Sequence, residues 1–406
     1  MINLETPKKL KPLVEQAHQV AAEVLRPISR KYDTAEHERP KELDMLAALI
    51  DRMEEGGGRS GAGATGVGGG SGPPPKDDGA NRNGSNLATV LSIIEMCWGD
   101  VGLLLALPGQ GLGNSAIASV ADEEQSKRYA GRWAAMAITE PEAGSDSAAI
   151  RTTAELDGDE YVLNGEKIYV TSGERAELVV VWASLDRNKG RAAIKSFVVE
   201  RSNPGMVLER LEHKLGIRAS DTAAFRLENC RVPKEALLGS PEIESKGGFE
   251  GAMKTFDNTR PLVAAMAVGV ARACLEETHE LLTRAGVDID RSRPALAQSA
   301  AAARFLALEA DYEAGRLLTL EAAWMADNGK PNSLQASMAK AKAGRAGVDV
   351  ALGCVELCGA TGYGEQELLE KWARDAKILD LFEGTQQIQL LIVARQLLGK
   401  SSAELK

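Results

Sequence analysis

A run of short β-type segments in the middle of the chain separates two stretches whose hydrophobic pattern is helical. Residues 178–183 (LVVVWA) and 196–200 (SFVVE) are rich in β-branched and aromatic side chains, whereas residues 250–286 repeat apolar residues at helical spacing. Strands and helices segregated along a chain in this way predict an α+β fold. We expect an N-terminal α-helical domain over residues 1–133, a middle β-domain over 134–242 and a C-terminal helical bundle over 243–406.

The C-terminal part contains successive helical patterns joined by short connections, which is typical of a bundle. These segments lie near residues 250–286, 296–328, 332–359 and 386–399. In the N-terminal part we expect two amphipathic helices over residues 6–54 and a strongly apolar helix pair over 87–107, interrupted near residues 99–102.

Glycine marks the expected loops and turns. Residues 56–84 are Gly-rich, include three consecutive prolines and hold too few apolar side chains to offset the entropy of ordering, so we expect a mobile surface loop. A phosphate-binding loop would need the GxxxxGK[ST] pattern after a strand, and this stretch has neither. The dipeptides Asp157-Gly158 and Asn164-Gly165 predict turns between or beside the strands.

The charge and the composition exclude several classes of partner. The chain has a net charge of −10 and a pI of about 5.2, which argues against nucleic acid, because phosphate binding needs a basic surface. The longest apolar helix candidate, residues 262–275, contains Arg272 and is too short to cross a bilayer, so we expect no membrane insertion.

The N-terminal segment and the cysteine pattern favour a cytoplasmic protein. The first residues lack the apolar core of a signal peptide, and the five cysteines are scattered without a CxxC pair. The histidines show no ligand spacing, so we expect no metal site. They are His18, His37, His213 and His279.

An isolated carboxylate, Glu383, precedes an apolar helix pattern near the C-terminal end. Thr385 is placed to cap the first turn of that helix by accepting a backbone N–H. Gly384 permits a sharp turn, which would let the carboxylate project into a cavity while backbone amides point at a ligand. The alternative is an ordinary acidic residue that the helix dipole favours at a helix N-terminus.

Several motifs follow one another in an order that resembles the acyl-CoA dehydrogenase family. They are AITEPEAGSD (137–146), NGEKIYVTSG (164–173), GIRASDT (216–222), FDNTRP (256–261) and RDAK (374–377) leading into FEGTQQIQ (382–389). The resemblance extends over nearly the whole chain from residue 91 onward. It implies the family architecture, in which two helical domains flank a β-domain, and an FAD cofactor.

The activity that the resemblance implies is α,β-dehydrogenation of an acyl-CoA thioester, a reaction of fatty acid and lipid metabolism. A general base removes the α-proton while a β-hydride passes to flavin N5, which gives a trans-2-enoyl-CoA. In most subtypes the base is the glutamate that matches Glu383, whose backbone N–H also binds the thioester carbonyl together with a flavin ribityl hydroxyl. Some subtypes carry the base at the position of Thr259, and because threonine cannot do that work, Glu383 remains the candidate.

The resemblance also implies a set of binding residues. Cofactor contacts are implied for Thr139 and Thr171 at the isoalloxazine edge, Tyr169 against the flavin ring, Ser145 near the phosphates, and Thr385 and Gln387 near the adenosine and pyrophosphate. Substrate contacts are implied for Ser145, Phe256, Asp257, Arg260 and Gly384. The alternatives are ordinary strand threonines, a core tyrosine, and a surface ion pair between Asp257 and Arg260 on one helix.

Two segments depart from the family pattern. Homomeric members hold each FAD across a dimer interface with an Arg-x-x-Phe-Gly and a Gln-x-x-x-Gly stretch of the neighbouring subunit. Here residues 283–290 read TRAGVDID, and Glu356 and Ala360 stand where the glutamine and the glycine would be. Aspartates such as Asp288 would repel a pyrophosphate. We therefore hypothesise a tetramer of the α2β2 type, in which a homologous subunit completes the FAD site.

The electron acceptor implied by the resemblance is an electron-transfer flavoprotein. Two alternatives stay open at this point. One is an acyl-CoA oxidase-type flavoenzyme that passes electrons to oxygen, and the other is a non-catalytic subunit of a heteromeric dehydrogenase.

Overall fold

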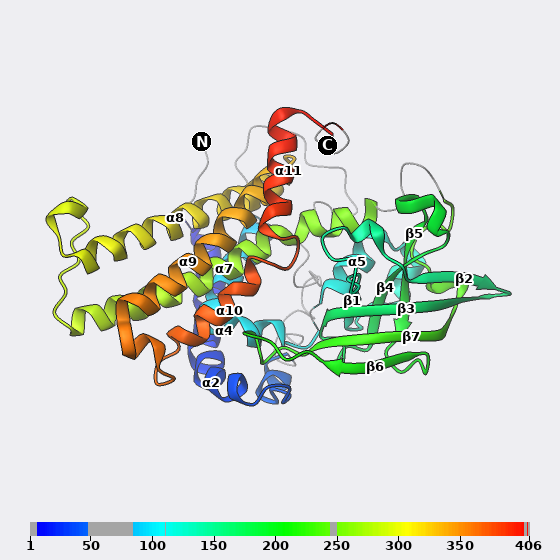
Figure 1. The fold of residues 1–406 in the computed structure, drawn as a ribbon, viewed down its shortest axis with the longest axis horizontal. Coiled ribbons are helices and arrows are strands. Elements are labelled where there is room, and N and C mark those ends of the chain that lie inside the picture. Colours follow the sequence, from blue (N-terminus) through cyan, green and yellow to red (C-terminus); the bar gives the residue numbers. More distant parts are fainter. Residues whose placement is uncertain (1–5, 48–83, 110, 244–249, 402–403, 405–406) are drawn as a thin grey trace.

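The computed structural model describes residues 6–47, 84–109, 111–243, 250–401 and 404, and for residues 250–258 it describes the backbone alone. A helical part and a β-sheet part lie side by side along the long axis of the molecule (Figure 1). The α+β architecture predicted from the sequence is therefore confirmed. The Gly-rich segment 56–84 lies outside the described residues except for Gly84.

The N-terminal part is helical up to the first strand. Its elements are α1 (Lys11–Val20), a π-helical turn (Ala21–Leu25), α2 (Arg26–Thr34), α4 (Ser85–Leu105), α5 (Leu112–Val120) and α6 (Glu123–Arg128). α4 continues to Leu105, but Asp100 has φ −166° and ψ 120°, which kinks the helix. The interruption predicted near residues 99–102 is thus present as a kink within one helix.

α4 is the most apolar long helix among the described residues. By length and composition alone it could cross a membrane, which corrects the expectation that no helix of the chain was long enough. However, 67% of its apolar window is buried inside the protein, as in the core helix of a globular bundle. α4 packs closely against α7 (Glu250–Arg284) at Gly269, because a Cβ at that position would lie 2.4 Å from the carbonyl oxygen of Ile94 on α4.

The middle part is a single sheet of seven strands. These are β1 (Ala134–Ala137), β2 (Thr153–Asp157), β3 (Glu160–Thr171), β4 (Leu178–Ser184), β5 (Ile194–Glu200), β6 (Met206–Leu211) and β7 (Thr222–Pro233). The order across the sheet is β1-β4-β2-β3-β7-β6, and β5 pairs with β4. β1 runs parallel to β4, whereas the pairs β2/β3, β3/β7, β6/β7 and β4/β5 are antiparallel.

The two predicted turns have different outcomes. Asp157-Gly158 begins the tight connection of the β2/β3 hairpin, in which Asp157 pairs with Glu160. Asn164-Gly165 lies inside β3 instead, at a shift of the register with β7. A Cβ at Gly165 would lie 2.4 Å from Thr152 Oγ1, so this glycine serves a bulge and a close approach rather than a turn.

The C-terminal part is a bundle, as predicted. Its helices are α7 (Glu250–Arg284), α8 (Ala300–Asp327), α9 (Ser333–Tyr363), α10 (Leu369–Leu379) and α11 (Gln386–Leu398). α7, α8 and α9 lie along one another in the long arm of the bundle (Figure 1). The sequence interpretation missed α10, a short helix whose buried residues Leu369, Trp372 and Leu379 lie on one face.

A buried ion cluster fixes α10 against α4. Lys371 lies between Asp100 and Asp375, and all three side chains are at most 2% exposed. Lys371 Nζ is 2.7 Å from Asp375 Oδ2 and also donates to Asp100 Oδ2. Asp375 Oδ1 accepts the backbone N–H of Ile217 at 2.5 Å, so the cluster also holds the loop between β6 and β7. This network positions the helix that leads into Glu383.

Candidate active site

Glu383 lies in the turn between α10 and α11, where two consecutive residues have left-handed backbones. The φ angles are 55° at Glu383 and 89° at Gly384, and the Gln386 N–H donates to the Asp380 carbonyl oxygen at 3.1 Å. The hydroxyl of Thr385 accepts the N–H of Ile388 at 3.4 Å, which is the predicted N-cap. A non-glycine residue with positive φ is uncommon, and such residues cluster at functional sites.

A buried glutamine holds the carbonyl groups of this turn. Gln389 Nε2 donates to the carbonyl oxygens of Glu383 (3.1 Å) and Gly384 (3.3 Å). Gln389 is 0% exposed although it lies on α11, most of which is partly or fully exposed. The turn is therefore fixed from inside, and no described residue accepts a hydrogen bond from the backbone N–H of Glu383.

The carboxylate of Glu383 contacts the helix α7. Thr259 Oγ1 donates to Glu383 Oε2 at 2.7 Å, and Thr259 is 1% exposed. Burial raises the pKa of the Glu383 carboxyl above its usual range, while the Thr259 hydroxyl and the charges of Arg260 and Lys340 act in the opposite direction. A desolvated carboxylate with a raised pKa is a stronger base than one in water.

Two buried cations lie beside the carboxylate. Lys340 of α9 donates from Nζ to the Gly384 carbonyl oxygen at 2.7 Å, and burial lowers the pKa of Lys340 to about 8 against the pull of Asp380 and Glu383. Arg260 is 3% exposed, and its Nη1 lies 3.4 Å from Ser337 Oγ. Its burial is incompatible with the alternative of a surface ion pair at this position.

Lys340 was missed by the sequence interpretation, although the sequence carries a signal. It stands between Ala336, Ala339 and Ala343, which are buried, so it is a lysine on the apolar face of its helix. Buried lysines are rare unless they are paired or functional. The sequence identifies Thr259 only as a position that cannot supply a base, whereas in the structure its hydroxyl bonds to the carboxylate.

Four of the positions expected to contact the flavin lie on the sheet and on the loop after β1. The Ile168 N–H donates to the Thr139 carbonyl oxygen at 2.9 Å, which brings the loop beside the end of β3 that carries Tyr169 and Thr171. Tyr169 is 62% exposed with φ 58°, so it is not the core residue of the alternative interpretation. Ser145 is exposed in the same loop.

The remaining predicted positions are placed as follows. Thr385 uses its hydroxyl for the cap of α11, and Gln387 is exposed on the first turn of that helix. Phe256 and Asp257 belong to the part of α7 whose side chains lie outside the description. The structure thus unites Glu383, Thr259 and the two cations, whereas among the described residues it gives no contact between this group and the flavin positions on β3 and the loop after β1.

A buried ion pair supports the loop that follows β1. Glu140 (5% exposed) and Lys167 (0% exposed) are 2.7 Å apart, and Glu140 also accepts hydrogen bonds from Thr152 and from the Arg151 N–H. Burial lowers the pKa of Lys167 to about 8, and Glu140 opposes this shift. Because Glu140 follows Thr139 directly, this pair fixes the backbone from which Thr139 projects.

Solved structures with the same architecture define the class of this fold. A chain in a structure described as the electron transferring flavoprotein of Acidaminococcus fermentans is 30% identical, with a TM-score of 0.80 over 98% of this chain and 100% of that one. Butyryl-CoA dehydrogenase from Megasphaera elsdenii is 28% identical, with a TM-score of 0.81 and the same coverage. The class is the fold of the acyl-CoA dehydrogenases.

The sequence comparison gives the family. Residues 135–230 match the model of the acyl-CoA dehydrogenase middle domain, and residues 246–398 match the acyl-CoA dehydrogenase C-terminal domain. The mitochondrial short-chain specific acyl-CoA dehydrogenase of Rattus norvegicus is 39% identical over 268 residues, which are 64% of this chain and 62% of that protein. The chain belongs to the acyl-CoA dehydrogenase family, and the match spans less than two thirds of such curated relatives.

Proposed function

We propose that this chain, with bound FAD, dehydrogenates an acyl-CoA thioester between its α- and β-carbons and that Glu383 is the general base. The observation that supports this most is the environment of Glu383. Its carboxylate is desolvated, held by Thr259 at 2.7 Å and flanked by two buried cations. A surface acid at a helix N-terminus would have none of these features.

The chain's own residues can perform the proton transfer. The α-proton of a thioester is weakly acidic, so the base needs a raised pKa and the enolate-like charge needs stabilisation. Desolvation provides the first at Glu383. The cationic groups of Lys340 and Arg260 provide a positive environment that can stabilise the enolate-like charge. The backbone N–H of Glu383, which has no acceptor among the described residues, adds a hydrogen-bond donor to that environment.

The residues on β3 and on the loop after β1 fit an FAD. Tyr169 presents an exposed ring, and the side chains of Thr139, Ser145 and Thr171 have no hydrogen-bond partner among the described residues. These groups, with Thr385 and Gln387 of α11, would hold the cofactor. When bound, FAD supplies the acceptor for the β-hydride.

A homologous subunit completes the FAD site in an α2β2 tetramer. The last turns of α7 and α9 lie side by side, since Cys358 Sγ donates to Thr278 Oγ1 at 3.6 Å. Near these turns Asp288 is 72% exposed at its side chain and pairs with the half-exposed Arg293 at 3.2 Å, whereas Glu356 is exposed. Exposed acidic groups are poorly suited to hold the pyrophosphate of a second FAD, which supports a division of labour between two kinds of subunit.

The proposed activity is tested by anaerobic addition of straight-chain and branched acyl-CoA thioesters to the purified flavoprotein. We expect the flavin absorbance to bleach with at least one of them and mass spectrometry to identify the trans-2-enoyl-CoA. Bleaching by none of the thioesters, with FAD bound, would contradict the proposal.

The same preparation distinguishes the electron acceptors. We expect an electron-transfer flavoprotein to reoxidise the reduced enzyme much faster than dissolved oxygen does. Rapid formation of peroxide in air would instead identify an oxidase.

A further inference from the structure

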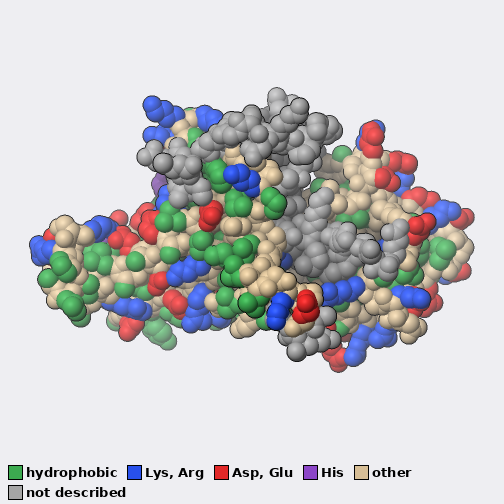
Figure 2. Space-filling view, turned by 90° about the horizontal axis from the view of Figure 1, so that it is seen from above, with side chains coloured by type: hydrophobic (Ala, Val, Ile, Leu, Met, Phe, Trp, Pro, Cys, Tyr) green, Lys and Arg blue, Asp and Glu red, His purple; other side chains and the backbone are tan. Residues whose placement is uncertain are grey.

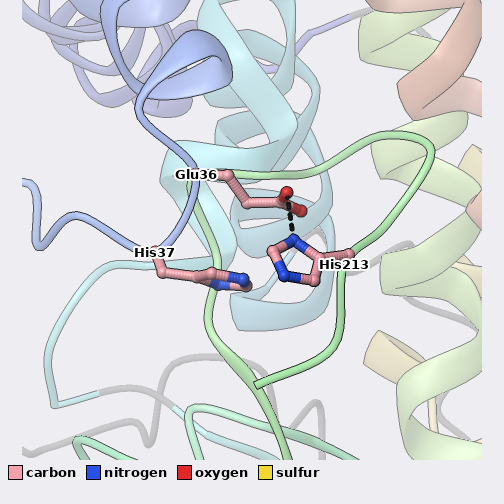
Figure 3. A group of neighbouring side chains, drawn as sticks. All are labelled: Glu36, His37 and His213. Atoms are coloured by element: carbon pink, nitrogen blue, oxygen red, sulfur yellow. Dashed lines mark hydrogen bonds and ion pairs between the residues drawn. The ribbon is translucent and has the colours of Figure 1, made fainter. Parts of the chain in front are cut away.

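Three potential metal ligands from distant parts of the sequence meet at the contact between the N-terminal helices and the sheet. Glu36 and His37 follow the end of α2, and His213 lies in the loop between β6 and β7 (Figure 3). One ligand atom of each of the three lies within 4.8 Å of the others. Figure 3 shows the Glu36 carboxylate and the His37 ring both directed toward the His213 ring.

The contacts within this cluster are polar and close. His213 Nδ1 is 2.9 Å from Glu36 Oε2, and the two imidazole rings stack edge to face with their centroids 4.8 Å apart. The backbone N–H of Lys214 donates to the other Glu36 oxygen at 2.9 Å, so the carboxylate is held in place. This arrangement of one oriented carboxylate and two rings resembles a preformed ligand set.

His37 provides the independent observation that points to a ligand. Both of its ring nitrogens are enclosed by the protein, and neither has a hydrogen-bond partner among the described residues. Buried polar atoms are almost always satisfied, so this ring requires an explanation. A metal bound to one nitrogen would satisfy it.

We propose that Glu36, His37 and His213 form a binding site for a divalent transition metal of the zinc type. Two imidazoles and one carboxylate are ligands that zinc accepts, and three protein ligands leave a fourth position for water. His213 is 82% exposed at its side chain, which leaves room for that water. The sequence interpretation expected no metal because the histidines lack ligand spacing, but Glu36 and His213 are 177 residues apart and meet only in the fold.

Only a small adjustment is needed to close the site. Zinc bonds to nitrogen and oxygen are about 2 Å long, so ligand atoms lie at most about 4 Å apart. The ligand atoms of Glu36, His37 and His213 lie within 4.8 Å of one another, and rotation of the exposed His213 ring can shorten these separations to that limit. The ammonium of the adjacent Lys214 donates to the Ser220 carbonyl oxygen at 2.8 Å.

The bound ion would tie two parts of the fold together. Glu36 and His37 belong to the N-terminal helical part, whereas the loop of His213 also carries Ile217, which bonds to Asp375 of α10. An ion at this point therefore adds a crosslink to a loop that already joins the sheet to the bundle. We expect its effect to be on stability rather than on proton transfer.

The test measures binding of Co²⁺ to the full-length purified protein after treatment with a chelator. We expect one Co²⁺ per chain, with the visible absorption of a nitrogen and oxygen site, and displacement by Zn²⁺ but not by Mg²⁺. His213→Ala and Glu36→Gln should each weaken binding at least tenfold. Glu36→Gln keeps an oxygen that can accept the Lys214 N–H, so a folding defect is not expected.

His18→Ala is the matched control. His18 Nδ1 also lies 2.9 Å from a carboxylate, that of Glu95, but Arg272 binds the same carboxylate at 2.6 Å, and among the described residues no third ligand completes a group there. This variant should bind Co²⁺ like the wild type. Zn²⁺ should raise the unfolding temperature of the wild type and not that of His213→Ala. Absence of stoichiometric binding, or equal binding by His213→Ala, would overturn the proposal.

Discussion

The role proposed for Glu383 depends on three neighbours as much as on its own carboxylate. Thr259 fixes one carboxylate oxygen, Gln389 fixes the carbonyl beside it, and Lys340 fixes the next carbonyl. The proposed base is thus restrained through its side chain and its backbone. Such restraint lowers the cost of reaching the reactive geometry, because the turn does not have to be ordered when substrate binds.

At the residue scale, the buried cation Lys340 on α9 should contribute to the pH dependence, beside the Thr259 hydroxyl and Arg260. Burial raises the pKa of Glu383, whereas the charge of Lys340 lowers that pKa. The proposed base accepts a proton only when it is ionised, so we expect activity to rise with pH through this pKa. Lys340→Met removes the cation. We expect the acidic limb of kcat/KM to move up by about 1 pH unit.

The neighbouring Lys342 gives the control for this prediction. Its side chain is 36% exposed and pairs with the half-exposed Asp311. Lys342→Met should leave the pH profile unchanged. A profile of Lys340→Met that coincides with the wild type would show that this cation does not act on the base.

The candidate site could be predicted from the sequence only in part, and the residues show why. The cap at Thr385 and the turn at Gly384 depend on neighbours in the chain, and local patterns report such neighbours. The bond from Thr259 to Glu383 joins residues 124 positions apart, so it depends on how α7 packs against the turn. The partnership of Glu36 with His213 was invisible for the same reason.

At the scale of elements, the same limit applies to α10. The long helices were predictable because their apolar residues repeat over many turns. α10 is short and carries Lys371, Arg374, Asp375 and Lys377, so its pattern looks polar. Its charges are satisfied by distant partners, such as Asp33 for Arg374 and Asp100 for Lys371. The apolar repeat of Leu369, Trp372 and Leu379 is short and is interrupted by these charged residues, whose burial depends on partners far away in the chain.

The ion cluster on α10 should be essential for stability. Burial tends to lower the pKa of Lys371, but Asp100 and Asp375 outweigh it and raise that pKa, so the lysine is charged. Lys371→Met leaves two buried carboxylates without a cation. We expect the free energy of unfolding, measured by denaturant titration, to fall by about 3–5 kcal/mol.

A surface lysine provides the comparison. Lys127 pairs with Glu123 on α6, and the two side chains are 74% and 85% exposed. Lys127→Met should change the free energy of unfolding by no more than about 1 kcal/mol. Equal effects of the two substitutions would mean that burial of the cluster on α10 does not determine its contribution.

At the scale of the whole molecule, exposed apolar side chains on α11 bear on the proposed assembly. α11 rises from the bundle in Figure 1, and four of its leucines are exposed. They are Leu390 (52%), Leu391 (53%), Leu397 (67%) and Leu398 (62%). Figure 2, seen from that side, shows hydrophobic side chains gathered in the middle of the face, with charged side chains around them. Large exposed apolar groups on a soluble protein mark interaction surfaces.

The flavin content and the mass of the assembly test the α2β2 hypothesis. We expect the chain purified alone to hold little FAD, and the complex with a co-expressed homologous subunit to hold one FAD per heterodimer. Native mass and flavin absorbance measure both quantities. A tetramer of this chain alone with one FAD per subunit would show that Asp288, Glu356 and Ala360 are tolerated in a homomeric enzyme.

The central claim is that the carboxylate of Glu383 takes the α-proton, and the rate of anaerobic flavin reduction by an acyl-CoA tests it most directly. Glu383→Gln keeps the shape of the side chain and removes the base, so we expect the rate to fall by at least about 100-fold with FAD still bound. Thr259 lies 2.7 Å from the carboxylate, so Thr259→Glu in the Glu383→Gln background should restore a measurable part of the rate. Flavin reduction by Glu383→Gln at the wild-type rate would contradict the account.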